Sequence, residues 1–266
     1  MSEEGPAQAI RFRAVAEVER PSLFRASRRF SRAMEVRVTH SSSSVIDALR
    51  GPDRVLLQDR LVPRRLARGD VLYFAGDRRR RIHLVSSGVL KLAARTAEGD
   101  ETILFLALPG DLLGEVAALD DLAQPLDAVA AAESVVLGMD ADLLVEILER
   151  NPAASLELAR QMGRRLRWIC DSALERTSSE VPARLAGRLL DLADLLGQME
   201  RGAIEMDLPL AQHDLGSLAG MCRESACKTL RRFKAEGLLD YRGRRLRILR
   251  PDALERIRCS GRMDKT

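Results

Sequence analysis

The chain has 266 residues, enough for two ordinary domains that each bury a core of their own. Its 43 Lys and Arg against 39 Asp and Glu give a net charge of +4, and its four cysteines form no CxxC pair, which argues against a disulfide framework or a zinc site. No stretch reaches the roughly 18 apolar residues of a membrane span, and the N-terminus lacks the apolar core of a secretory signal. We therefore expect a cytoplasmic protein without a membrane partner.

The first 44 residues show no sustained periodicity and end in the run Ser41–Ser44. They are rich in arginine and also contain acidic residues. This composition predicts a flexible N-terminal extension over residues 1–44. Alternatively, translation starts at Met34, in which case residues 1–33 are not made.

Short apolar runs between Val45 and about Met139 are interrupted by glycines at close intervals, as in GDVLYFAGD and EGDETILFLALPGDLLGE. Several short strands with glycine-rich turns are typical of an antiparallel sandwich or barrel. The four arginines at 78–81 lie between two such runs and are interpreted as a solvated turn. We predict one antiparallel β domain over residues 45–150.

A long helix is predicted over residues 151–179, because Asn151-Pro152 is a favourable start and no helix breaker follows. Apolar residues recur along it with the 3-4-3-4 spacing of a two-stranded coiled coil. The seam positions are Ala159, Met162, Leu166, Ile169 and Ala173. A helix that packs only on its own domain shows a wider apolar stripe, so we expect a homodimer, with packing inside the chain as the alternative.

The C-terminal part predicts a helix-turn-helix with a basic wing over residues 180–256, followed by a tail over 257–266. A first helix at about 211–219 and a second at about 223–236 are separated by Gly220, which permits a tight turn. The segment 238–248 then predicts strand, basic turn, strand. Lys and Arg outnumber Asp and Glu ten to three between positions 221 and 250, which indicates a polyanion partner.

The side chains expected on the second helix match the chemistry of base readout. Arg can pair with guanine through two hydrogen bonds, Glu can accept from cytosine N4, and Lys can donate to guanine. The predicted base-reading residues are Arg223, Glu224 and Lys228. The predicted phosphate contacts are Gln212, Ser225, Arg244 and Arg245.

Taken together, these motifs resemble the Crp/Fnr family of bacterial transcription regulators over about Val45–Leu254. The resemblance is carried by GDVLYFAGD, IHLVSSGVLKL, PGDLLGE, NPAASLELARQMGRRLR and CRESACKTLRRFKAEGLL. It implies an α+β chain with an antiparallel β-roll (jelly-roll) sensor domain of the cyclic-nucleotide-binding type, a long dimerisation helix and a C-terminal winged helix-turn-helix. It also implies that Arg223, Glu224 and Lys228 read a half-site, and it places Cys222 where a small hydroxyl residue often contacts phosphate.

The function that this resemblance implies is sequence-specific transcription regulation. The expected partners are double-stranded DNA with an inverted-repeat (palindromic) operator and a second copy of the chain, and RNA polymerase is a further candidate. Two other classes of function would require features of their own in the sequence. A small-molecule receptor with incidental DNA affinity would need a cationic or aromatic constellation in the roll, which the sequence does not reveal. An enzyme would need a nucleophile-base motif, a Walker loop or a metal triad, so no catalytic residue is expected.

Cyclic nucleotide binding is not expected in the sensor domain. In members that bind such ligands, a Glu holds the ribose and an Arg-Ser pair holds the cyclic phosphate. Gly114 and Glu115 match the start of that segment, but the Arg-Ser positions fall on Pro125 and Leu126. Residues 96–149 contain no Lys or Arg, and a buried phosphate needs a cationic partner.

The purine side of the same pocket is also degenerate. The polar pair that meets the purine aligns with Ile169-Cys170, which leaves at most one weak partner. Glu115 is therefore interpreted as a hydrogen-bonding residue of the turn, and we expect an effector other than cyclic AMP, or none. No cofactor or metal is expected, since no cysteine precedes Cys170 and His83, the one histidine of the sensor domain, is interpreted as structural.

Overall fold

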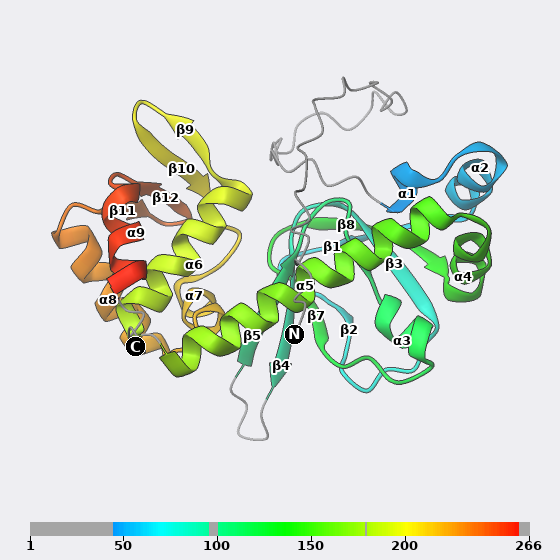
Figure 1. Cartoon of the computed structure of the whole chain (residues 1–266), viewed down its shortest axis with the longest axis horizontal. Helices are drawn as coiled ribbons and strands as arrows, with labels where there is room; N and C mark the ends of the chain where they lie inside the picture. Colours follow the sequence, from blue (N-terminus) through cyan, green and yellow to red (C-terminus); the bar gives the residue numbers. More distant parts are fainter. Residues whose placement is uncertain (1–44, 96–100, 179, 261–266) are drawn as a thin grey trace, which may run out of the picture. The chain divides into compact units, whose positions relative to one another are not determined.

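The computed structural model describes residues 45–95, 101–178 and 180–260 (Figure 1). Its sensor domain contains eight short strands, as the glycine-punctuated runs predict. They are β1 (Val62–Leu66), β2 (Val71–Tyr73), β3 (Arg81–Ser87), β4 (Leu90–Arg95), β5 (Glu101–Ala107), β6 (Leu112–Leu113), β7 (Asp127–Ala130) and β8 (Ser134–Asp140). They form two antiparallel sheets, one ordered β1-β8-β3-β6 and the other β2-β7-β4-β5. The predicted β-roll is thus confirmed.

The two sheets share one apolar core. Alternate residues point into this core on β5, as Phe105 and Ala107 do. Inward residues from both sheets, such as Val85 and Leu92, pack in the same cluster. The other face of the β1-β8-β3-β6 sheet is covered by helices, because Ile82 on β3 packs with residues of those helices in a second cluster.

Residues 45–60 correct the sequence-based expectation that strands begin at Val45. They form two helices, α1 (Val45–Ala48) and α2 (Gly51–Arg60). A proline sits in the first turn of α2, where its missing N–H costs no hydrogen bond. Helix α2 buries Leu57 against α4 (Ala141–Arg150), since Leu57 and Leu144 belong to one cluster, whereas α1 packs against the long helix that follows α4. The short apolar spacing there fits a helix as well as a strand, and tertiary packing decides for the helix.

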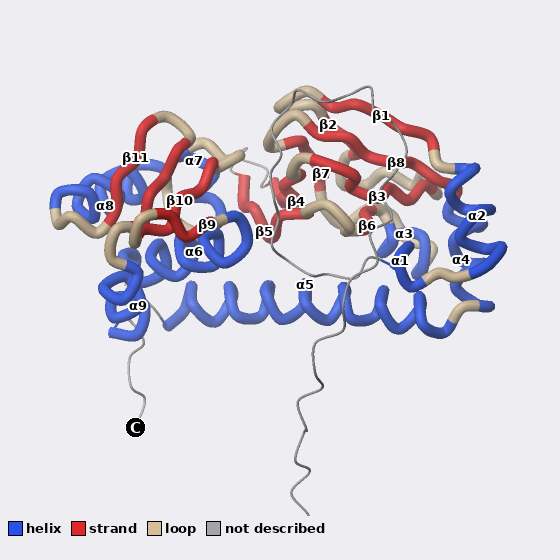
Figure 2. Tube along the Cα trace, turned by 90° about the horizontal axis from the view of Figure 1, so that it is seen from above, coloured by secondary structure: helices blue, strands red, loops and turns tan. Residues whose placement is uncertain are grey.

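The predicted long helix is confirmed as α5 (Pro152–Ser178), one unbroken helix of 27 residues (Figure 2). One side of it packs on the roll, where Ala154, Leu158 and Gln161 are buried. The predicted seam lies on another side. Met162 is 36% and Leu166 62% exposed, Ala159 and Ala173 are also exposed, and Ile169 is half-buried. The stripe that the spacing singled out is therefore largely uncovered within one chain.

The C-terminal domain contains the predicted helices and wing together with elements that the sequence did not reveal. Its elements are α6 (Val181–Leu196), β9 (Gln198–Glu200), β10 (Ala203–Asp207), α7 (Gln212–Leu218), α8 (Arg223–Ala235), β11 (Leu239–Arg242), β12 (Arg245–Ile248) and α9 (Pro251–Ser260). The wing belongs to a sheet ordered β11-β12-β10-β9, in which the β9-β10 hairpin was not predicted. The expected boundary between domain and tail at 257 is wrong, because α9 continues to Ser260.

The predicted N-terminal extension over 1–44, with the alternative start at Met34, lies outside the described residues. The same holds for residues 261–266. Within the described ranges, no helix is both long enough and apolar enough to cross a membrane.

Candidate nucleic-acid interface and effector pocket

The helices α7 and α8 pack as the sequence predicts. Leu215 and Leu218 of the first helix are buried, as are Ala226, Leu230 and Phe233 of the second. Gly216 permits the close approach of the two helices, because a Cβ atom there would lie 3.1 Å from the Met221 carbonyl oxygen and 3.2 Å from the Ala226 Cβ. The position of α8 is thus fixed by a packed core.

The start of α8 presents polar side chains to solvent. Arg223, Glu224 and Lys228 are exposed, and none of them has an ion-pair partner among the residues that the structure describes. Ser225 and Cys227 are half-buried instead. The Ser225 carbonyl accepts a hydrogen bond from the Thr229 hydroxyl at 2.8 Å. Three side chains with base-reading chemistry therefore stand together at the N-terminal end of one helix.

The predicted phosphate contacts fall into two groups. Gln212 is exposed at the first residue of α7, and its Oε1 accepts from the Cys227 thiol at 3.7 Å. Arg244 is tethered, because its Nε donates to the Leu208 carbonyl at 3.1 Å and lies 3.8 Å from Asp207. Arg245 is exposed and begins strand β12, so the predicted basic turn is shorter than expected and consists of Gly243 and Arg244.

Cys222 is the residue that caps α8 at its N-terminal end, and its side chain is exposed. Its Sγ lies 3.2 Å from the Ser225 hydroxyl. Hydrogen bonds from the Ser225 side chain and backbone lower the pKa of the Cys222 thiol. A thiol is a weaker hydrogen-bond donor than a hydroxyl, so Cys222 is less suited to a phosphate contact than the hydroxyl residue that the resemblance implies there.

The region that the resemblance aligns with an effector pocket contains a cation from outside residues 96–149. Arg165, on α5, forms a buried ion pair with Glu115, and their side chains are 12% and 3% exposed. Arg165 Nη2 also donates to the Leu112 carbonyl at 2.6 Å, and its guanidinium lies 4.7 Å from the centre of the Phe105 ring. Glu115 is thus hydrogen-bonded within the chain, with a partner that comes from α5 rather than from its own turn.

Backbone geometry places Glu115 beside Arg165. Gly114 precedes α3 (Glu115–Asp120) with a φ of 87°, and a Cβ there would lie 2.5 Å from the Arg81 carbonyl oxygen. Only glycine fits both conditions. Burial raises the pKa of Glu115, while the charge of Arg165 opposes that rise. The paired arginine thus helps to keep the buried carboxylate ionised.

The other residues predicted for the pocket separate into two sets. Leu126 and Ile169 are half-buried and pack against the apolar core of the roll. Pro125 and Cys170 are exposed, so they do not line an enclosed site within the chain. The inward Phe105 ring and the Arg165 side chain lie next to Glu115, at the position where the resemblance implies a bound sugar.

A β-roll followed by a long helix and a winged helix-turn-helix, with base-reading side chains at the start of the second helix of the pair, defines a DNA-binding regulator with a sensor domain. Comparisons with known protein families agree. The cyclic nucleotide-binding domain matches residues 63–151, and the Crp-like helix-turn-helix domain matches residues 183–257.

Several characterised proteins are similar along most of their length. A CRP-like cAMP-activated global transcriptional regulator of Mycobacterium tuberculosis is 30% identical over 200 residues, which are 75% of this chain and 89% of the relative. The fumarate and nitrate reduction regulatory protein of Escherichia coli K12 is 26% identical, covering 75% of this chain and 80% of the relative. A solved CRP-family regulator from Thermus thermophilus is 28% identical with a TM-score of 0.64, covering 74% and 97%. The chain belongs to the Crp/Fnr family of transcription regulators, and these relatives are regulators rather than enzymes.

Proposed function

We propose that this regulator binds an inverted-repeat operator as a homodimer, without cyclic AMP as its effector. The observation that carries the proposal is the group Arg223, Glu224 and Lys228, which is exposed and without ion-pair partners in the described part of the chain. These residue types pair with guanine or cytosine edges in the major groove. The largely uncovered seam of α5 supports the second copy, and two copies would present two reader helices about one helical turn, roughly 34 Å, apart.

The arrangement around Glu115 supports the absence of cyclic AMP. A cyclic phosphate needs a charge-assisted donor. The available guanidinium, that of Arg165, already pairs with Glu115 and covers the Phe105 ring. The positions expected to hold the phosphate are Pro125 and Leu126, which have no donating side chain. The relative from M. tuberculosis is named as cAMP-activated, so this chain would differ from it in effector.

Operator selection from random duplexes tests the DNA-binding part of the proposal. We expect an inverted repeat, protected on both half-sites. Replacing Arg223 with alanine should relax base preference at one position per half-site, at a cost of about 1–3 kcal/mol in binding free energy. Arg245→Ala is the matched control, since this wing residue should weaken all sequences alike and reduce the salt dependence. Protection of one half-site by a monomer would refute the proposal.

Calorimetry tests the effector part. We expect no binding heat with cyclic AMP up to about 1 mM, and an operator affinity that changes less than about twofold when the nucleotide is added. Micromolar binding that raises operator affinity tenfold, about 1.4 kcal/mol of coupling, would contradict the proposal. Loss of that binding in Glu115→Gln would then locate the nucleotide beside Arg165.

A further inference from the structure

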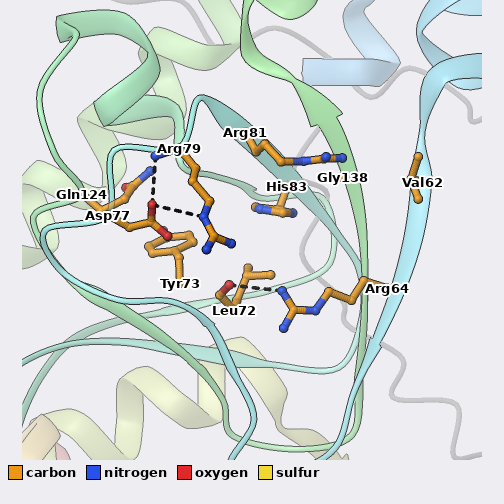
Figure 3. A pocket seen from close by; sticks show the side chains of 10 residues that line it. All are labelled: Val62, Arg64, Leu72, Tyr73, Asp77, Arg79, Arg81, His83, Gln124 and Gly138. Carbon is orange, nitrogen blue, oxygen red and sulfur yellow. Dashed lines mark hydrogen bonds and ion pairs between the residues drawn. The ribbon is translucent and has the colours of Figure 1, made fainter.

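A cavity of about 270 Å³ opens in the β-roll (Figure 3). Neither Glu115 nor Arg165 lines it. Tyr73 lies between the two regions. Its ring lines the cavity, and its hydroxyl is close enough to Glu115 that the charge of this carboxylate, together with burial, raises the pKa of the hydroxyl. The cavity is thus separate from the pocket that the Glu115–Arg165 pair fills.

Three arginines from different elements line this cavity. Arg64 comes from β1, Arg81 from the start of β3 and Arg79 from the loop before it. Arg64 donates to the carbonyls of Leu72 at 3.2 Å and Val71 at 3.1 Å, so its guanidinium is held in place without a carboxylate partner among the described residues.

Only one acidic residue, Asp77, stands among the residues that line the cavity. It lies 3.8 Å from Arg79 and accepts a hydrogen bond from the Arg79 backbone at 2.9 Å. In the described part of the chain, Arg81 has no acidic partner. Two of the three guanidinium charges are therefore not compensated by a carboxylate. Residues 78–81 are exposed, as the predicted solvated turn requires, and Arg79 and Arg81 together with Arg64 give the cavity the electrostatics of an anion site.

The floor of the cavity contains a buried nitrogen that lacks a partner. His83 Nδ1 is shielded from water and has no hydrogen bond within the described ranges, and an unsatisfied buried polar atom costs about 1–3 kcal/mol. The strand β8 passes close to it because residue 138 is glycine. A Cβ there would lie 3.3 Å from His83 Nδ1 and 3.5 Å from Arg81 Nη2, so both nitrogens face the same glycine in the lining of the cavity.

The remaining walls are mostly apolar, with Gln124 as the further polar residue of the lining. Val62, Leu72 and the Tyr73 ring line the cavity, and that ring stacks on the His83 imidazole with the centroids 6.4 Å apart. A site of this kind orients a ligand through a few polar groups and buries the rest of the ligand against apolar surface. An inorganic ion would leave that apolar surface without a contact. We propose that this cavity binds a small organic anion, whose carboxylate or phosphate group lies between Arg64, Arg81 and His83 and whose apolar part lies against Tyr73.

His83 also supplies the signal for a test. Burial, together with the charges of Arg81 and Arg64, lowers the pKa of His83 to about 4. We therefore expect its imidazole to stay neutral at pH 6 in the free protein, as measured by NMR. A bound anion would offset the two guanidinium charges and raise this pKa, whereas Asp77 and Tyr73 remain in place in both states.

The experiment uses the full chain without DNA, so its outcome is independent of operator binding. Benzoate and phenyl phosphate are the carboxylate and phosphate probes, inorganic phosphate tests the anion alone, and benzamide is the neutral isostere of benzoate. We expect benzoate or phenyl phosphate to bind with a Kd of about 1 mM or lower and to shift the His83 signals. Whichever of the two binds more tightly identifies the anionic group, and benzamide should not bind.

Matched variants locate the binding. Arg81→Gln should weaken it at least about tenfold, since it removes a charge-assisted donor. Gly138→Ala should abolish it by filling the space beside His83, and circular dichroism reports whether this variant folds. Arg78→Gln removes the same charge from the same arginine run but does not line the cavity, so it should bind like the unaltered protein. Equal losses in Arg78→Gln and Arg81→Gln, or no His83 shift with any of the three anions at about 10 mM, would overturn the proposal.

Discussion

Replacing Leu166 with glutamate is expected to leave the protein monomeric and to lower its operator affinity at least about 100-fold. Leu166 lies in the middle of the seam of α5 and is 62% exposed in the single chain. In a symmetric pair of helices the two copies of this residue would meet near the axis. The substitution removes the burial of two leucines, about 1.5–3 kcal/mol each, and brings two like charges together.

Analytical ultracentrifugation measures the assembly state, and fluorescence anisotropy with a labelled operator measures the affinity. Arg167→Glu is the control, because it introduces the same acid one residue away on the same helix but off the seam. It should remain dimeric. Circular dichroism should show that Leu166→Glu keeps its helices, since the residue is not part of either core. A dimeric Leu166→Glu protein would mean that the seam lies elsewhere.

Replacing Arg165 with methionine is expected to lower the free energy of unfolding of the sensor domain by about 3–5 kcal/mol at pH 7. The variant leaves Glu115 as a buried carboxylate without its cation. A buried charge without a partner is what makes the loss of one member of an ion pair strongly destabilising. The Leu112 carbonyl keeps a donor, because Gln161 Nε2 also reaches it at 3.1 Å. The loss is therefore expected to arise mainly from Glu115.

Urea denaturation, followed by the fluorescence of Trp168, the single tryptophan of the chain, measures this loss. Arg167→Met removes an exposed arginine from the same helix and should change the free energy by less than about 0.5 kcal/mol. Adding Glu115→Gln to Arg165→Met should recover more than half of the loss, since no buried charge remains. A double variant as unstable as Arg165→Met would show that the ion pair is not the cause.

The same variant should have a distinctive pH dependence. Without Arg165, burial is left to raise the pKa of Glu115 above that of the unfolded chain. A carboxyl with a raised pKa favours the folded state when it is protonated, so its contribution is present at low pH and is lost as pH rises through the folded pKa. The deficit of Arg165→Met relative to the unaltered protein should therefore shrink between pH 7 and pH 5.

The fold was predictable where local pattern and tertiary packing agree. Leu215, Leu218, Leu230 and Phe233 recur at helical spacing on either side of Gly220, and all four are buried where that spacing places them. The β-roll and the long helix follow from the same kind of signal. The helices at 45–60 could not be predicted in this way, because their apolar residues are few and are fixed by contacts with α4.

The same distinction separates the site residues that could be predicted from the sequence from those that could not. Arg223, Glu224 and Lys228 lie on one helix, so their spacing alone brings them together. Arg165 and Glu115 are 50 positions apart, and no periodicity links a position on α5 with the start of α3. Arg79 and Arg81 were interpreted as part of a solvated run, and they are exposed. The cavity that they line could not be predicted, because Arg64 and Gly138 become their neighbours only when the roll closes.

In the Glu115–Arg165 pair, the group that lies beside Glu115 is a side chain of the protein itself. Because the Arg165 side chain is covalently part of the protein, its local concentration beside Glu115 does not depend on the concentration of any metabolite. Neither dialysis nor dilution removes it. Under the proposed function, this regulator does not respond to the abundance of a cyclic nucleotide at that position. A metabolite that controls it would then bind elsewhere, and the cavity beside His83 is lined with side chains suited to receive one.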